Sequence, residues 1–323
     1  MTGLAFTDGP SHVKPGEARS VGSGDAKGFA IIAVITLVVT GWLSSHSPGR
    51  AADSTPTVES DTTSLLEFFP DDALLGFVEI PAGAFTMGSD PGIDPQAYAN
   101  ERWSSSSYQG TVELPGFYIG RYEVTIAQFR AFVSATNYRA DSQALAGAPD
   151  HPVGFVSWPD ALAYCRWLET TLSQWPETPA PLERLLGDGW RVTLPSEAQW
   201  EKAARGSDGR IFPWGNQPRR DRANYESSSA TRIGSFACPE CPFGVADMAG
   251  NVWELTRSPY GPYPFDPATD NLDTVDLDAD ALWVMRGGSY SESEQNVRAA
   301  IRGGADPGAR RPFIGFRVVL TPP

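Results

Sequence analysis

Three cysteines are the residues of this chain whose type and spacing are best suited to chemistry. Cys238 and Cys241 are separated by two residues, and Cys165 stands alone. A C-x-x-C pair serves structural zinc when a second Cys or His pair follows at similar spacing, and none follows here. It serves thiol–disulfide exchange in a βαβ context, which this sequence does not show. In a domain outside the cytoplasm, the pair therefore predicts a local disulfide that clamps its loop.

Residues 247–254 form the most distinctive string of the sequence and read Asp-Met-Ala-Gly-Asn-Val-Trp-Glu. Two acids, Asp247 and Glu254, frame a Gly-Asn turn and a tryptophan in a region with few periodic runs. Neither the helical nor the strand spacing of apolar residues fits this string. It therefore predicts a fixed, irregular backbone. Two further short strings follow it, at residues 286–290 and 315–318.

The composition narrows the class of protein. The chain has 323 residues and a net charge of −14, with 10 Trp, 32 Gly and 28 Pro. This acidity argues against nucleic acid as a partner, because phosphate binding needs clustered Lys and Arg. It favours solubility, with an affinity for divalent cations as the alternative interpretation. Abundant Trp, Gly and Pro predict ordered loops in which large aromatic side chains supply much of the buried area.

The N-terminal region divides into a tail, an apolar segment and a linker. Residues 28–45 carry no charge and are mostly apolar, which predicts a transmembrane signal-anchor. Basic residues precede this segment and acids follow it, so residues 1–27 are expected in the cytoplasm and the remainder on the periplasmic or other extracytoplasmic side. A cleaved signal peptide is the alternative. Residues 46–73 then form a polar linker, and one folded domain spans 74–323.

The domain is expected to mix short strands with a few helices. Alternating apolar residues predict strands at 76–80, 84–87, 112–114, 117–119, 283–285, 299–302 and 316–320. Helical spacing predicts one helix from Thr125, another over 158–172 and a short third one that Ser196 caps. Cys165 falls on the inner face of the second helix and is expected to be a small buried core residue. Residues 175–189, rich in Pro and Glu, are expected to be an inserted loop.

Eight short motifs occur in order along this domain. They lie at residues 85–89, 122–125, 151–158, 194–197, 213–216, 247–254, 286–290 and 315–317. Together they resemble the formylglycine-generating enzyme (sulfatase-modifying factor) family over residues 74–320. The resemblance implies one α+β domain of the C-type-lectin-like type, with little regular secondary structure, preceded here by the expected transmembrane helix.

The resemblance also implies bound calcium. The ligands carried over to this chain are the side chains of Asp247 and Glu254 and the backbone carbonyls of Gly250 and Val252. Calcium accepts such a mixture of carboxylate, carbonyl and water oxygens. The alternative is that Asp247 and Glu254 cap local turns while Trp253 fills the core. A second family calcium corresponds to Asn224 and the carbonyl of Tyr225, but the segment that should supply its acid is shortened here.

The residues for the family's best-known chemistry are missing. Members of that branch oxidise a substrate cysteine to formylglycine with Cu(I) held between two cysteines, both just after the Gly-Gly-Ser-Tyr element. Here that element continues through residues 291–298 without a cysteine. Serine cannot replace a thiolate toward Cu(I), so copper is not expected. Other relatives bind iron through histidines, but this chain has only His12, His46 and His151.

Two functions therefore remain open. In the first, the protein oxidises an exported peptide or protein substrate, as a branch without the cysteine pair does during siderophore maturation, and Ser289, Tyr290 and Arg298 line its pocket. In the second, it is a non-catalytic, calcium-stabilised binding or scaffold module with a partner in the cell envelope. Arg298 is equally open to ion pairing with the abundant acids. A deep cleft at Ser289 would favour the enzyme, and a filled or flat surface the binding module.

Overall fold

The computed structural model describes residues 68–266 and 281–323. Within these two ranges, no helix is long and apolar enough to cross a membrane. The segment expected to do so, residues 28–45, lies outside the described residues, as do the expected tail 1–27 and the linker up to residue 67. The transmembrane helix thus stays a prediction.

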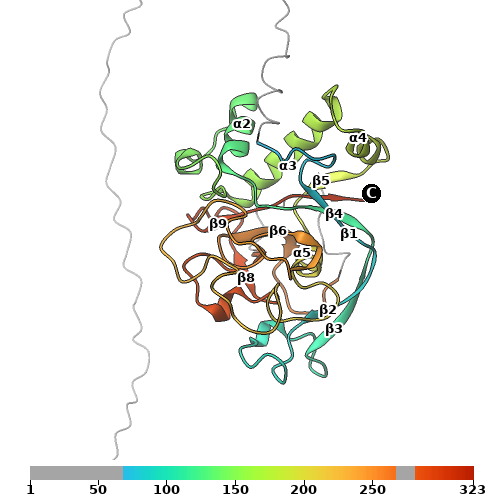
Figure 1. Cartoon of the computed structure of the whole chain (residues 1–323), viewed down its shortest axis with the longest axis vertical. Helices are drawn as coiled ribbons and strands as arrows, with labels where there is room; N and C mark the ends of the chain where they lie inside the picture. Colours follow the sequence, from blue (N-terminus) through green and yellow to red (C-terminus); the bar gives the residue numbers. More distant parts are fainter. Residues whose placement is uncertain (1–67, 267–280) are drawn as a thin grey trace, which may run out of the picture. The chain divides into compact units, whose positions relative to one another are not determined.

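The first sheet brings the two ends of the domain together. Its strand order is β1-β4-β10-β5, and neighbouring strands run antiparallel. The strands are β1 (Phe77–Ile80), β4 (Phe117–Gly120), β5 (Arg191–Thr193) and β10 (Val319–Thr321). The C-terminal strand β10 is paired on both sides, so the last residues of the chain form part of the core sheet (Figure 1).

A hairpin and a second sheet complete the β-structure. The hairpin joins β2 (Gly83–Gly88) to β3 (Gln109–Leu114). The second sheet has the order β8-β7-β6-β9 and contains one parallel pair, β6 with β9. Its strands are β6 (Trp253–Pro259), β7 (Trp283–Arg286), β8 (Arg302–Ala305) and β9 (Ile314–Gly315). Residues 247–252 lead directly into β6, so this sheet fixes the position of the distinctive turn.

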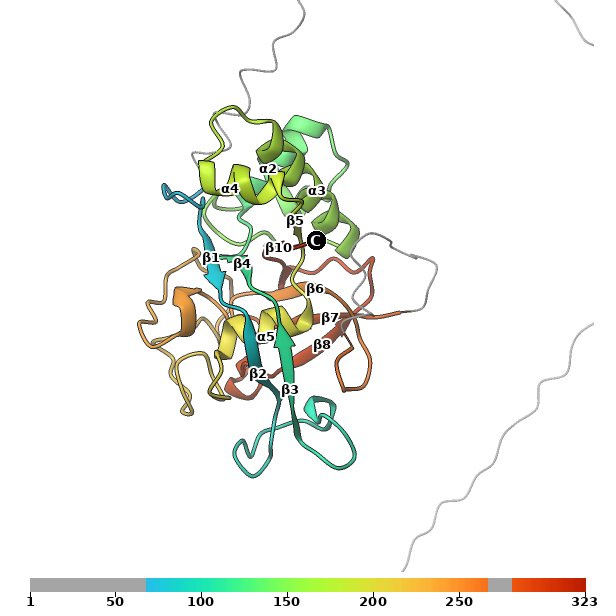
Figure 2. The same ribbon diagram turned by 90° about the vertical axis from the view of Figure 1, so that its right-hand side faces the viewer.

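Local capping starts three of the four α-helices in the described part of the chain. The helices are α2 (Ile126–Thr136), α3 (Trp158–Gln174), α4 (Ala180–Gly187) and α5 (Glu197–Arg205). Thr125, Ser157 and Ser196 each close a capping box at the start of α2, α3 and α5. Helices α2, α3 and α4 gather at one end of the domain, whereas α5 lies beside β6 and β7 (Figure 2).

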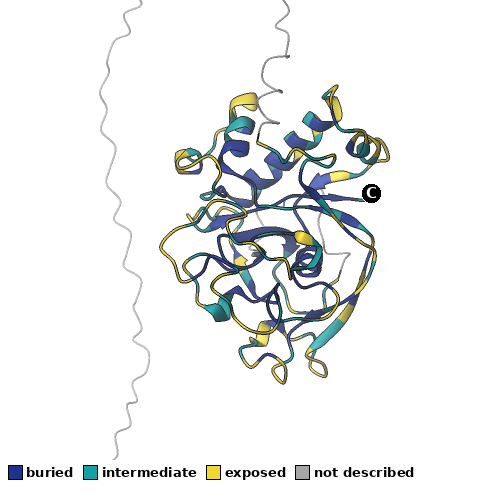
Figure 3. Ribbon diagram, viewed as in Figure 1, coloured by how far each residue is buried: buried dark blue, intermediate teal, exposed yellow. Residues whose placement is uncertain are grey.

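Aromatic side chains fill much of the core beneath these helices. The ring of Phe129 packs against Phe132, Tyr164 and Phe316 at centroid distances of 5.4, 6.2 and 6.5 Å. The inner faces of the helices and strands are buried, and exposed residues concentrate in the loops (Figure 3). Cys165 is fully buried with a free thiol, which confirms the core role expected for it.

Several expected elements differ from the structure. Residues 180–187 of the expected inserted loop form helix α4, whose Leu182 is fully buried. The strand expected at 299–302 begins only at Arg302, and of the one expected at 316–320 only the last two residues lie in a strand, β10. Strands β5 and β6 were not expected. Apart from the first residue of β5 and the last residue of β6, both strands are buried throughout, so they lack the apolar–polar alternation that reveals a half-exposed strand.

Candidate functional site

The turn before β6 has the irregular backbone that its sequence indicates. Asp247, Gly250 and Asn251 all have left-handed backbones, with φ of 56°, 75° and 58°. A side chain at Gly250 would place its Cβ 2.1 Å from the carbonyl oxygen of Asn224, so only glycine fits there. The Asn251 side chain donates to Glu123 Oε1 at 3.0 Å and accepts from the backbone N–H of Thr231 at 3.0 Å. The turn is therefore fixed by contacts to segments distant in sequence.

Glu254 is fully buried and already neutralised. Arg317 donates from Nε to Oε2 at 2.5 Å and from Nη2 to Oε1 at 2.6 Å. The indole N–H of Trp200 donates to Oε2 at 2.8 Å. Both carboxylate oxygens are thus engaged. Burial lowers the pKa of the Arg317 guanidinium, but the adjacent carboxylate of Glu254 raises it. The pKa of Arg317 therefore lies above its ordinary value.

Glu123 and Asp247 form a buried acidic pair beside this ion pair. Burial, and then the charge of Asp247, raise the pKa of Glu123 well above its ordinary value of 4.5. Burial also raises the pKa of Asp247, although the N–H of Gly234 donates to its Oδ2 at 2.6 Å. Glu123 Oε2 is buried without a hydrogen-bond partner. Because Arg317 is held by Glu254, this pair needs a shared proton or a bound cation to balance its charge.

These contacts decide how the calcium ligands implied by the resemblance fit. Asp247 fits, because burial and a like-charged neighbour leave its carboxylate in need of a cation. Glu254 does not fit as well, since Arg317 and Trp200 engage both of its oxygens. Glu123 offers the unpartnered oxygen in its place. The sequence did not single out Glu123, because its proximity to Asp247 arises only from the tertiary fold.

Side chains alone do not make a metal site here. In residues 68–266 and 281–323, no group of three or more His, Cys, Asp and Glu side chains is arranged to hold a metal ion. A cation at Asp247 would thus also need backbone carbonyls, such as those of Gly250 and Val252, and water. At the second expected position, the Oδ1 of Asn224 accepts from Ser227 Oγ at 2.6 Å, and Tyr225 is buried. Both calcium sites stay predictions.

The expected pocket residues are mostly buried. Ser289 is 0% exposed, and its Oγ lies 3.2 Å from Ser291 Oγ. Arg298 is also 0% exposed and donates to Asp94 at 2.6 Å and to Glu101 at 2.5 and 2.8 Å. The structure thus shows the ion-paired state of Arg298. Tyr290 is half-buried.

A carboxylate occupies the segment in which the copper-binding cysteines of the best-known relatives belong. Glu292 accepts from the indole N–H of Trp253 at 3.2 Å and from the amide of Asn296 at 2.8 Å. Three cavities of the described residues are lined by neither Ser289, Tyr290 nor Arg298. Ser289 and Arg298 themselves are fully buried.

Buried ion pairs connect α5 to the second sheet. Glu197 accepts from Arg286 at 3.0 Å and from Arg302 at 2.6 and 2.7 Å. Glu201 accepts from Arg286 at 2.6 Å and from Arg205 at 2.7 Å. Burial works against ionisation of Glu201, but the charges of Arg286 and Arg205 hold its pKa below the ordinary value. The motifs at 194–197 and 286–290 are therefore joined to each other in the interior.

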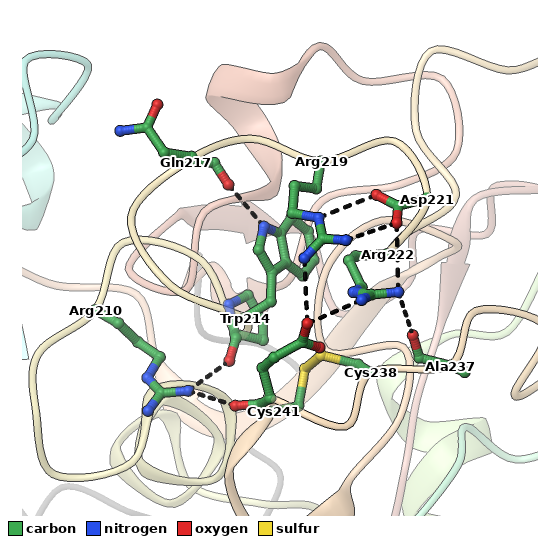
Figure 4. The surroundings of a disulfide bond; sticks show 11 residues. Arg210, Trp214, Gln217, Arg219, Asp221, Arg222, Ala237, Cys238 and Cys241 are labelled. Atoms are coloured by element: carbon green, nitrogen blue, oxygen red, sulfur yellow. Dashed lines mark hydrogen bonds and ion pairs between the residues drawn. A yellow bond between two sulfur atoms is a disulfide. The ribbon is translucent and has the colours of Figure 1, made fainter.

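The C-x-x-C pair forms a local disulfide. Cys238 and Cys241 are bonded, with their Cα atoms 5.3 Å apart. Glu240, between them in sequence, accepts from Arg219 at 3.2 Å and from Arg222 at 2.8 Å. Figure 4 shows these two arginines beside the disulfide. The disulfide and these ion pairs hold together a loop that lacks regular secondary structure.

The described fold defines an α+β protein in which irregular loops are held by buried ion pairs. Residues 64–322 match the sulfatase-modifying factor enzyme 1-like domain, and the chain therefore belongs to the formylglycine-generating enzyme family. It is 29% identical to the formylglycine-generating enzyme of Mus musculus, covering 76% of this chain and 75% of that protein. It is 27% identical to hercynine oxygenase of Mycolicibacterium smegmatis, covering 75% and 60%.

Solved structures agree with this assignment. PvdO from Pseudomonas aeruginosa superposes with a TM-score of 0.59 at 25% identity, covering 76% of this chain and 94% of that one. Variable protein 1 of Treponema denticola superposes with a TM-score of 0.57 at 22% identity, covering 76% and 95%, which shows a common fold alone. The family and its α+β fold, as implied by the sequence motifs, are thereby confirmed, whereas the preceding transmembrane helix stays a prediction.

Proposed function

We propose that this protein is an exported, membrane-anchored member of the family that binds a peptide or protein and does not perform copper-dependent oxidation. One observation carries this proposal. The segment after the Gly-Gly-Ser-Tyr element supplies Ser291 and Glu292 instead of thiolates, and these hard oxygen ligands do not suit Cu(I). The cysteines of the chain are engaged elsewhere, one in the core and two in the disulfide.

The burial of the expected pocket supports binding rather than catalysis at this position. Ser289 and Arg298 are inaccessible and satisfied by neighbours, so they are not poised to contact a substrate. The disulfide supports an oxidising compartment outside the cytoplasm. That location agrees with the signal-anchor that residues 28–45 predict.

Calcium is proposed as a structural ion of this scaffold. Asp247 and Glu123, with the carbonyls of Gly250 and Val252, would hold it, and the ion would neutralise the buried acidic pair. The unpartnered Oε2 of Glu123 supports this ligand set. The ion would stabilise the conformation of the turn before β6 and would take no part in a reaction.

Oxidation of an exported peptide without copper thiolates is the second candidate. The likeness to formylglycine-generating enzymes and to hercynine oxygenase favours it, because these relatives are named for oxidative reactions. Its reacting centre would have to lie away from the buried Ser289.

Both candidates are tested with the full-length protein in mild detergent. The protein is incubated with Cu(I), oxygen and a cysteine-containing sulfatase peptide, and the peptide is then analysed by mass spectrometry beside a metal analysis of the protein. We expect the peptide to be unchanged and copper to be lost on desalting. Copper retained one to one, together with aldehyde in the peptide, would overturn the proposal. Aldehyde without bound copper would select the second candidate.

A further inference from the structure

A groove beside β8 differs in character from the buried Ser289. It has a volume of about 550 Å³, and its lining includes Asn100, Arg102, Tyr260 and Tyr263. The groove and Trp253, the tryptophan of the motif at residues 247–254, lie on opposite faces of β8. A side chain at Gly303 would meet Trp253, whereas one at Gly304 would meet Tyr260.

Exposed apolar side chains gather around this groove. Of the five large apolar side chains that are exposed in the described residues, two contact residues that line it: Tyr108 and Leu282. The Tyr108 ring lies 4.6 Å from the guanidinium carbon of Arg102. Leu282 meets the same position of β8 as Tyr260. Exposed tyrosines beside a groove are typical of protein-binding surfaces.

The groove is also positively charged in an otherwise acidic protein. The chain has 39 Asp and Glu against 25 Lys and Arg, yet none of the groove-lining residues within 68–266 and 281–323 is acidic. Arg302, at its base, is neutralised by Glu197. The exposed Arg102 donates only to the carbonyls of Ser104 and Ser105, and it has no carboxylate partner among the residues that the structure describes. Arg102 thus presents one uncompensated positive charge.

From this combination we infer that the groove binds an extended, acidic, proline-containing segment of a partner polypeptide. Aromatic-lined grooves accept proline-rich segments, whose extended backbone is preformed and loses little entropy on binding. The Nη1 group of Arg102 donates to neither serine carbonyl, so it is available for a charge-assisted hydrogen bond to a carboxylate, which fixes the register of the peptide. This inference rests on the proposed binding function and names its surface and the class of its partner.

The test uses the full-length protein and a fluorescein-labelled decapeptide of alternating glutamate and proline. Fluorescence polarisation should show saturable binding that weakens with salt, with the glutamine–proline decapeptide weaker and the lysine–proline decapeptide not bound. The substitution Arg102→Gln should lower affinity about tenfold, as for loss of one charge-assisted pair. Tyr260→Ser should also weaken binding. Arg232→Gln removes an exposed arginine away from the groove and should change nothing.

A charge reversal makes the test independent of simple loss of folding. Arg102→Glu should lose the glutamate–proline peptide and gain the lysine–proline peptide, with an unchanged melting temperature. No binding of the glutamate–proline peptide, or binding that both Arg102 variants leave intact, would overturn the inference. In the latter case the peptide binds elsewhere and the proposed binding function stands. Copper-dependent aldehyde formation would overturn the proposed function itself, whatever these variants do.

Discussion

Replacement of Arg317 by methionine tests whether a buried ion pair holds the turn that identifies this family. Arg317 is 0% exposed and makes two hydrogen bonds to the carboxylate of Glu254, at 2.5 and 2.6 Å. It also donates to the carbonyls of Gly120, Arg121 and Ala246 at 3.0 to 3.2 Å. Methionine retains the aliphatic stem but removes every one of these donors and the positive charge.

The expected cost follows from burial. The change leaves Glu254 as an uncompensated buried charge beside two further acids, which should lower the free energy of unfolding by about 3–5 kcal/mol. Arg310 offers a matched control, because it also makes two hydrogen bonds to one carboxylate, that of Asp160, both at 2.9 Å. Its side chain is 36% exposed, so Arg310→Met should cost only about 1 kcal/mol.

Urea unfolding of both variants, followed by tryptophan fluorescence, measures this difference. Adding Glu254→Gln to Arg317→Met should recover part of the lost stability, because the double variant no longer carries the unpaired charge. Equal losses of about 1 kcal/mol for Arg317→Met and Arg310→Met would refute the reasoning that burial gives this pair its weight. A double variant no more stable than Arg317→Met would refute the role assigned to the orphaned carboxylate.

Three further predictions concern other buried groups. The folded-state pKa values of Glu123 and Asp247 are raised, so the calcium-free protein should gain stability as pH falls from neutrality toward 4.5, the ordinary pKa of a glutamate. Calcium should raise the stability and make it depend less on pH. Melting curves with and without chelator measure this, and a calcium-free protein whose stability rises with pH would contradict it. Replacing Cys238 and Cys241 together by serine should cost about 2 kcal/mol in urea unfolding, because the loop they close is short; no change in stability would contradict it. Burial raises the pKa of the Cys165 thiol, so peptide mapping should find it unmodified by iodoacetamide in the native state and modified after unfolding; modification in the native state would contradict it.

The sequence predicts those parts of the fold that depend on local chemistry. Capping boxes at Thr125, Ser157 and Ser196 are local hydrogen-bond patterns, and all three helices begin where the sequence indicates. Helix α4 was missed because Pro and Glu dominate residues 175–189, and its stability comes from docking Leu182 in the core.

The candidate site was less predictable because it is made by pairing across the chain. Glu123 Oε1 accepts from Asn251, which lies 128 positions away in sequence. The ion pair between Glu254 and Arg317 likewise spans 63 positions. The spacing of residues within one segment contains no information on such contacts. The motif at 247–254 could be recognised, but the partner that neutralises one of its acids could not.

Because such pairs maintain the fold, a chain can keep the fold of the family without the family's oxidation chemistry. Buried acids and arginines of the motifs bind one another in two pairs: Glu197 with Arg286, and Glu254 with Arg317. A change to any of them leaves a buried charge unpaired and threatens the fold. Residues 291–296, in contrast, are exposed or half-buried, and the buried ion pairs of this segment begin only at Arg298, so thiolates at 291–296 can be replaced without leaving an interior charge unpaired. The same scaffold can therefore persist when the oxidation chemistry is absent, and binding through its surface grooves needs only the scaffold.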